Sequence, residues 1–314
     1  MKKRIMVFLI SISLIGGVLF LLLPSNKNND AINTLDIEES EQFLSEQGNT
    51  VAYGIKDTHG NIIDTGTEIP LENNSASIIF SLDHNIDEER EYMLLVFQDY
   101  KLSDYFVENS KEKTNNYKFN MNPNSTKEFN LSIDIDKSSQ ELSLVVIRKP
   151  AYQLEEMDFN RANILGETLS GRYTVNDKTN ISKHREIIET KPDLILEDGT
   201  YDDLAIYNNI ERMKVAMTGT VGEELSLSVG NSWGEDITYA IIALTDWKQD
   251  VIIGDKEVIF TTVKNESRNV FNFQLPNKEA NFQFISFPFA YQVSENNYQS
   301  HYVFDTFRVL IQED

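Results

Sequence analysis

The chain has 314 residues, of which 40% are hydrophobic and 11% aromatic, so wholesale disorder is excluded and more than one packed core is possible. Its 28 Lys and Arg residues stand against 50 Asp and Glu, a formal charge of −22, which excludes nucleic acid as a partner because basic residues are too few to neutralise phosphates. Cysteine is absent from the sequence, which excludes disulfides, thiolate metal sites, a cysteine nucleophile and a lipidated cysteine.

The N-terminus begins MKKR, and residues 5–23 then form an uncharged apolar run that Pro24 ends. At about 1.5 Å per residue, the run is as long as a bilayer core is thick. The preceding positive charges predict a cytoplasmic N-terminus and an exported remainder. We interpret residues 1–24 as a signal-anchor, and the alternative is a cleaved signal peptide, although no A-x-A pattern follows. The predicted location is the cell membrane, with a single span through residues 5–23, or the medium if the signal is cleaved.

Residues 25–48 are polar and acidic, which predicts a spacer. The chain then changes to short runs that alternate or are apolar throughout, separated by turn residues. Examples are SASIIFSL, KEFNLSIDI and QELSLVVI, and later EELSLSVG, KEVIFTTV and ANFQFISF. The aromatic residues, mostly 18 Phe and 13 Tyr, favour strands over helices. We therefore predict an all-β fold for the rest of the chain.

One stretch occurs twice, as EYMLLVFQDYK in residues 91–101 and as TYAIIALTDWK in residues 238–248. The landmarks TGT, FN and AYQ also recur in the same order around the two copies. We interpret this as a tandem duplication, with one unit in residues 49–175, a linker in residues 176–200 and a second unit in residues 201–314. The alternative is that strand-rich sequences resemble one another through their alternation alone.

The length and strand pattern of each unit predict a β-sandwich, either immunoglobulin-like or jelly-roll-like. The predicted fold is therefore two tandem, duplicated β-sandwiches after an N-terminal transmembrane or signal helix. The runs MLLVF and AIIAL contain no polar residue, so we expect central strands that are covered on both faces, one of them by a crossing loop. Leu94 and Ile241 would be equivalent buried positions in these strands.

Each apolar run is followed by an acid, an aromatic residue and a lysine. Strand alternation predicts that the aromatic residues, Tyr100 and Trp247, point into the core of their own sandwich and close it. The alternative is that they face outward and, together with Trp233, form aromatic sites for a sugar ring or a protein partner.

Two acidic clusters offer the oxygen ligands that calcium prefers, one near the end of the first unit's strands and one at the entrance to the second unit. Their carboxylates are Asp134, Asp136 and Glu141, and Asp198, Asp202 and Asp203. The alternative is that both clusters are solvated turns, since neither has the length of an EF-hand loop. The four histidines lie far apart and have no metal-ligand spacing, so we expect no cofactor, with calcium as the alternative.

The sequence contains no nucleophile elbow, P-loop or dinucleotide-binding turn. We expect a bacterial surface protein that acts in binding, adhesion or scaffolding, with an unknown protein or glycan as ligand and no catalytic activity. The alternative is an extracytoplasmic carbohydrate-active or hydrolytic protein that uses carboxylates between the two units. A deep cleft lined by converging carboxylates would favour the alternative.

Overall fold

The computed structural model describes residues 50–108, 110–153, 168–176, 187–197 and 204–313. These residues confirm the all-β prediction, because they form strands and a single short 3-10 helix, Tyr298–His301. No helix among them is long and apolar enough to cross a membrane, and the predicted span and spacer lie outside the described residues. Residues Gly48–Asp314 form one compact unit.

The first sandwich consists of an outer and an inner sheet, which enclose one hydrophobic core. The outer sheet has the order β2-β1-β3-β8-β6, with bounds Ile62–Ile63, Thr50–Asp57, Ser75–Asn85, Ser125–Asp134 and Phe106–Val107. The inner sheet has the order β10-β9-β4-β5, with β7 also pairing with β4, and bounds Leu169–Thr174, Glu141–Arg148, Arg90–Gln98, Lys101–Leu102 and, for β7, Tyr117–Met121.

The second sandwich is built in the same way around a second core. Its outer sheet has the order β11-β19-β15-β12-β13, with bounds Leu194–Leu196, Ser267–Gln274, Glu224–Asn231, Ala205–Asn209 and Lys214–Val215. Its inner sheet has the order β14-β22-β20-β16-β17, with bounds Thr218–Thr220, Val309–Gln312, Ala280–Phe287, Ile237–Thr245 and Lys248–Asp250. Strand β18 (Ile259–Val263) also pairs with β16, and β21 (Phe304–Asp305) with β20.

The sequence predicted either an immunoglobulin-like or a jelly-roll-like sandwich, and both sandwiches have the immunoglobulin-like strand order. In the first, β1-β3-β8-β6 follow the order A-B-E-D and β10-β9-β4 the order G-F-C. In the second, β12-β15-β19 and β22-β20-β16 repeat A-B-E and G-F-C. The place of strand D beside β19 is taken by β11, a segment of the predicted linker. This linker segment therefore closes an edge of the second sandwich.

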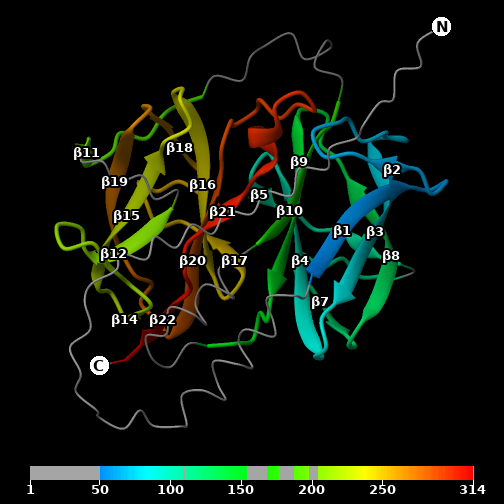
Figure 1. Ribbon diagram of the computed structural model, residues 1–314, viewed down its shortest axis with the longest axis horizontal. Helices are drawn as coiled ribbons and strands as arrows, with labels where there is room; N and C mark the ends of the chain where they lie inside the picture. Colours follow the sequence, from blue (N-terminus) through cyan, green and yellow to red (C-terminus); the bar gives the residue numbers. More distant parts are fainter. Residues whose placement is uncertain (1–49, 109, 154–167, 177–186, 198–203, 314) are drawn as a thin grey trace, which may run out of the picture. The chain divides into compact units, whose positions relative to one another are not determined.

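The two inner sheets pack against each other, and Figure 1 shows them at the centre between the two outer sheets. Alternate residues of β4 divide between two clusters: Leu94 lies in the first core and Leu95 in the cluster between the sandwiches. Strand β16 does the same with Ile241 and Ile242. Leu94 and Ile241 are buried as expected, at 0% and 1% exposure. The second face of each strand is covered by the other sandwich, which corrects the prediction of a crossing loop.

Truncating a buried side chain on either face of β4 should destabilise the protein to a similar degree. Leu94→Ala and Leu95→Ala each remove a fully buried side chain, so each should lower the free energy of unfolding by about 2 to 5 kcal/mol. Ile62→Ala, which truncates a side chain that is 74% exposed, is the control and should have little effect. Urea unfolding measures all three, and a Leu95→Ala variant as stable as Ile62→Ala would contradict the packing of the two inner sheets.

Candidate functional site: the sandwich junction and its aromatic surface

Two equivalent hairpin turns bring aromatic side chains to the junction, by which we mean the contact between the two inner sheets. Strands β4 and β5 are joined by Asp99 and Tyr100, whose φ angles are 48° and 67°, and β16 and β17 by Asp246 and Trp247, with φ angles of 48° and 65°. Two successive positive φ angles are typical of a type I′ turn, which suits a tight hairpin. A positive φ raises the conformational free energy of an aromatic residue by roughly 1 to 2 kcal/mol, so contacts of its side chain must offset this cost. The turn, rather than strand alternation, sets the direction of both rings.

The aspartate of each turn holds the beginning of the neighbouring strand. Asp99 Oδ1 accepts hydrogen bonds from the backbone N–H groups of Gln140 and Glu141, at 2.9 and 3.1 Å. Asp246 Oδ1 accepts one from the backbone N–H of Asn281, at 3.0 Å. A short acidic side chain that tolerates a positive φ and accepts backbone hydrogen bonds is therefore required at this turn position.

Both turn aromatics cross to the other sandwich. The Tyr100 side chain is 1% exposed, contacts the rings of Phe287 and Tyr291, and its hydroxyl accepts a hydrogen bond from the Tyr291 N–H at 2.6 Å. Trp247 is 7% exposed, and its Nε1 donates to the Pro150 carbonyl at 3.0 Å. This corrects the expectation that each closes its own core, and neither offers an open ring face to a ligand.

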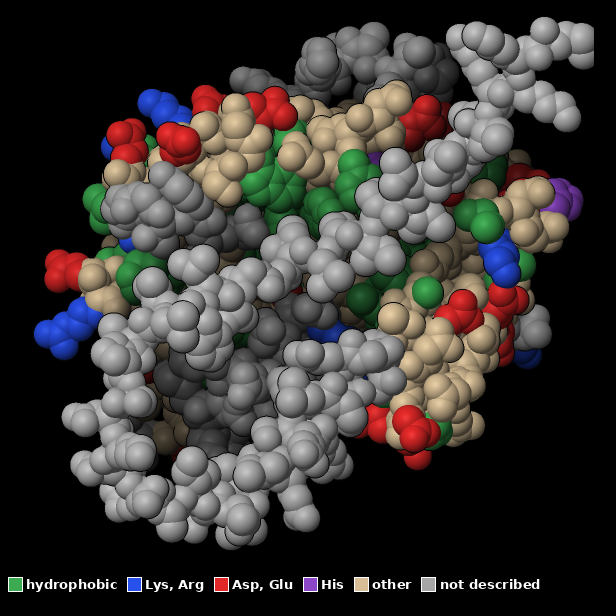
Figure 2. Space-filling view, viewed as in Figure 1, with side chains coloured by type: hydrophobic (Ala, Val, Ile, Leu, Met, Phe, Trp, Pro, Cys, Tyr) green, Lys and Arg blue, Asp and Glu red, His purple; other side chains and the backbone are tan. Residues whose placement is uncertain are grey.

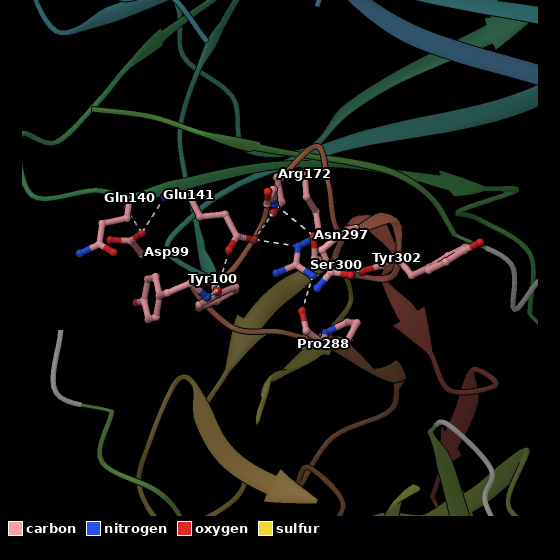
Figure 3. A network of polar contacts seen from close by, with 12 residues as sticks. Asp99, Tyr100, Gln140, Glu141, Arg172, Pro288, Asn297, Ser300 and Tyr302 are labelled. Atoms are coloured by element: carbon pink, nitrogen blue, oxygen red, sulfur yellow. Dashed lines mark hydrogen bonds and ion pairs between the residues drawn. The ribbon is translucent and has the colours of Figure 1, made fainter. Parts of the chain in front are cut away.

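A buried ion pair lies beside Tyr100 (Figure 3). Arg172 Nε donates to Glu141 Oε1 at 2.8 Å, and Tyr100 donates its hydroxyl to Glu141 Oε2 at 2.7 Å. Burial and the Glu141 carboxylate raise the pKa of Tyr100 well above its usual range, so the phenol keeps its proton and remains a donor. Arg172 Nη1 then reaches across the junction to the carbonyls of Pro288 and Tyr302, the latter at 3.3 Å.

Arg308 makes the corresponding contact in the opposite direction. Its Nη1 donates to the carbonyl of Lys149 at 2.7 Å, its Nη2 donates to that of Arg148, and its guanidinium lies 4.8 Å from the Trp247 ring centroid. Burial lowers the pKa of Arg308 to about 10, which leaves it charged at neutral pH. Each sandwich thus sends one arginine to the carbonyls that follow a central strand of the other. Neither arginine was predicted from the sequence, where the one signal for each is a basic residue in a largely apolar segment, GRYTV for Arg172 and FRVLI for Arg308.

Beside the junction, two loops of the second sandwich form an aromatic surface. Trp233, in the β15–β16 loop, is half-buried and contacts Tyr302 and Phe304 at ring distances of 6.0 and 5.6 Å. Tyr298 and Tyr302, in the β20–β21 loop, are 71% and 45% exposed and lie 5.8 Å apart. These are the B–C and F–G loops of an immunoglobulin-like sandwich, which lie at the same end of the fold. We call Trp233, Tyr298 and Tyr302 the aromatic surface.

The β20–β21 loop is fixed by contacts to both sandwiches. Gly66 of the first sandwich has a φ of 88°, and a Cβ built on it would lie 2.3 Å from His301 Nε2, so the loop approaches its backbone closely. Within the loop, His301 Nε2 lies 2.9 Å from the Ser294 carbonyl, and Ser300 Oγ donates to the Asn297 carbonyl at 2.7 Å. The aromatic surface is therefore preorganised.

A cavity of about 580 Å³ lies between residues of the two sandwiches. Among its lining residues are Asp99, Asp136, Glu257, Lys101, Lys256 and Tyr291. Asp99 already accepts backbone hydrogen bonds, and Glu257 pairs with Lys101 at 3.1 Å. Lys256 donates to Thr190 Oγ1 at 3.2 Å. Two of the three carboxylates that line the cavity, those of Asp99 and Glu257, therefore have partners within the protein.

The three calcium candidates that the structure describes are not gathered into one site. Asp134 pairs with Lys113 at 2.8 Å, Asp136 lines the cavity, and Glu141 is bound by Arg172 and Tyr100. Among the described residues, no three acidic or histidine side chains lie close enough together to hold a metal ion. The remaining candidates, Asp198, Asp202 and Asp203, lie outside the described residues.

Breaking the buried ion pair should destabilise the junction strongly. Arg172→Ala leaves the Glu141 carboxylate buried without its cation, which should lower the free energy of unfolding by about 3 to 5 kcal/mol. The double variant Arg172→Met/Glu141→Gln removes both charges and should cost less. Lys56→Ala breaks the solvent-exposed pair with Glu128 and is the control, expected to change stability little. If Arg172→Ala were no less stable than Lys56→Ala in urea, the ion pair would not hold the junction.

Stability should fall in alkaline solution because of buried tyrosines. Burial raises the pKa of Tyr173 to about 12 and also raises those of Tyr100 and Tyr105. In the unfolded chain these phenols ionise near pH 10, so above that pH the unfolded chain has released protons that the folded chain still holds. These tyrosines should therefore leave the free energy of unfolding unchanged below pH 10 and lower it as the pH rises above 10. Urea unfolding at stepped pH measures the slope, and Tyr173→Phe should reduce it; an unchanged slope in that variant would contradict the assignment.

No protein-family model matches the chain, and no curated protein matches it. Solved structures with some likeness include the E. coli chaperone DraB, with TM-score 0.26, 8% identity, and coverage of 85% of this chain and 97% of that chain. A chain from the Salmonella enterica SafA pilin–SafB chaperone complex has TM-score 0.27, 10% identity, and coverage of 82% and 96%. The Caenorhabditis elegans MSP-domain protein like family member SSP-19 has TM-score 0.22, 12% identity, and coverage of 35% and 91%. TM-scores this low carry no argument about function.

Proposed function

We propose that the chain is an extracytoplasmic surface protein, anchored in the cell membrane through residues 5–23, that acts in binding, adhesion or scaffolding. Its ligand is a protein or glycan, which it binds through the aromatic surface without catalysis and without a cofactor. The observation that carries this proposal is the exposure of Tyr298 and Tyr302 on a loop that other contacts hold in place.

An exposed and fixed aromatic loop is favourable for binding for two physical reasons. Tyr and Trp offer a large contact area at low conformational-entropy cost, because each has only two side-chain torsions. A loop already ordered before binding does not lose that entropy again on binding. Gly66, His301 and Arg172 supply this order for the β20–β21 loop. Figure 2 shows acidic side chains spread over the described part of one face, which keeps such a protein soluble.

We also propose that the two sandwiches are products of the tandem duplication inferred from the sequence, in residues 49–175 and 201–314. Supporting this, Asp99 and Asp246 hold equivalent turns, and Arg172 and Arg308 make reciprocal contacts. The parallel pairing of β14 with β22 also has a counterpart in the Glu68–Thr174 bridge. The aromatic surface belongs to the second sandwich alone, so the binding role would have arisen after duplication.

The hydrolytic alternative depends on the cavity between the sandwiches. Three carboxylates line it, those of Asp99, Asp136 and Glu257. Two of these are engaged, Asp99 with backbone N–H groups and Glu257 with Lys101. A glycosidase needs one carboxyl group free to donate a proton and a second free to act as base or nucleophile. We therefore favour binding over hydrolysis.

The proposal is tested by removing rings from the aromatic surface. The Tyr298→Ala/Tyr302→Ala variant of the full-length protein should bind its ligand from the native cell envelope at least about tenfold more weakly than the parent protein does. The reason is that aromatic residues at an interface carry much of the binding energy. Its melting temperature should stay near that of the parent, since Tyr298 is 71% exposed. Ile62→Ala, an exposed apolar truncation on β2, is the matched control. Equal retention by the double variant and by the control would refute the proposed binding surface.

A further inference from the structure

We infer that the ligand of the aromatic surface is an uncharged polysaccharide, whose sugar rings stack on Tyr298 and Tyr302 beside Trp233. This inference rests on the proposed function and names the chemical class of its ligand. Three features of the two loops carry it: the exposed aromatic rings, the polar groups around them, and the sign of their charges.

Sugar rings have an apolar face of C–H groups with a positive partial charge, which packs favourably on the negative face of an aromatic ring. Tyr298 is the most exposed aromatic residue of the surface, at 71%, and Tyr302 is 45% exposed. Arg172 holds the backbone carbonyl of Tyr302, and the Tyr302 ring packs against Trp233 and Phe304, so this ring is positioned before a ligand arrives. The two rings lie 5.8 Å apart at an interplanar angle of 87°, so they present surfaces in two directions to neighbouring sugars of one chain.

Polar side chains surround the exposed rings on the same loop. Glu295, Asn296 and Gln299 are all exposed, and they lie in the segment SENNYQSHY, residues 294–302. Amide side chains both donate and accept hydrogen bonds, and carboxylates accept two or more. A sugar presents several hydroxyl groups that need donors and acceptors at its rim, and this set of side chains supplies both.

The charges of the two loops exclude an anionic ligand. Residues 232–236 and 288–303 contain no Lys or Arg, but they include Glu235, Asp236 and Glu295. Together with a formal charge of −22 for the chain, these acids repel sulfated, phosphorylated or uronic acid polymers. A neutral glycan has no charge to repel and needs no cation for recognition.

The position of the surface argues against an extended peptide. A peptide that adds to a sheet needs a strand edge with free backbone N–H and C=O groups. The aromatic surface lies on the loops that join β15 to β16 and β20 to β21, at strand ends rather than along an edge. Within the β20–β21 loop, backbone carbonyls of Ser294, Asn297 and Tyr302 already have partners.

The test uses the full-length protein and five defined probes: hexamers of maltose type, cellulose type and N-acetylglucosamine as neutral glycans, polygalacturonate as an anionic glycan, and hexalysine as a cationic peptide. The chain has two tryptophans, and Trp247 is buried at the junction, so a ligand that stacks on the surface should alter the fluorescence of Trp233. At least one neutral hexamer should bind, with an affinity that changes little between about 50 and 500 mM salt because no ion pair forms. Trp233→Phe should abolish the fluorescence change.

Variants that change only the Tyr298 side chain distinguish the loss of ring stacking from the loss of folding. Tyr298→Ala should weaken binding of the neutral hexamer at least about tenfold, whereas Tyr298→Phe, which keeps the ring, should stay within about threefold. Ile62→Ala should bind like the parent. Calorimetric titration measures the affinities, and melting temperatures confirm that each variant is folded.

Two results distinguish failure of the glycan assignment from failure of the binding function. If no neutral hexamer binds, or if hexalysine or polygalacturonate binds instead with strong salt dependence, while envelope capture still depends on Tyr298 and Tyr302, the glycan assignment is overturned and the binding function stands. If envelope capture is also independent of both tyrosines, the proposed function fails with it.

Discussion

Burial of the second face of β4 against the second face of β16 is the constraint on which the rest of the structure depends. An isolated sandwich would expose Leu95, Phe97 and their neighbours to water, at a cost of about 25 cal/mol for each Å² of apolar surface. Packing the two inner sheets together removes this cost for both sandwiches at once. The two sandwiches therefore form one compact unit rather than two modules that move independently.

The polar groups at the junction give this apolar contact a defined geometry. A guanidinium can be buried only where carboxylates or carbonyls accept its hydrogen bonds. Those carbonyls are available because the chain leaves β9 and β20 through residues with positive φ, Lys149 at 45° and Phe289 at 53°, which turn the backbone out of the sheet. Arg172 and Arg308 then reach carbonyls of the opposite sandwich in a reciprocal arrangement. A shift of one sandwich against the other would take both arginines away from the carbonyls that they bind across the junction.

The aromatic surface depends on the same junction. The β20–β21 loop starts at Pro288, whose carbonyl is bound by Arg172, and passes Tyr291, whose N–H donates to the Tyr100 hydroxyl. It ends with Tyr302, held by Arg172 again, so the exposed rings are ordered by the contacts that join the sandwiches. The first sandwich therefore supports the aromatic surface without contributing its rings, and variants of the junction that remain folded would also loosen the aromatic surface.

The sequence by itself determined the all-β class, the strands, the two strand-rich regions and the burial of Leu94 and Ile241, because period-two alternation and turn residues are local signals. It also identified Trp233 as a candidate, since an aromatic residue in the polar segment SWGED is conspicuous. It could not assign β11, because a three-residue strand next to Pro192 is too short for a period. Only the tertiary structure decided what covers β4 and β16, why Tyr100 and Trp247 turn away from their own cores, and which carboxylates are already bound. The cover of the two strands and the direction of the two rings depend on contacts between residues more than 90 positions apart in sequence, such as Trp247 with Pro150 and Tyr100 with Tyr291. The bound carboxylates depend on shorter separations, such as the 31 positions between Glu141 and Arg172, and no local pattern encodes either kind of contact.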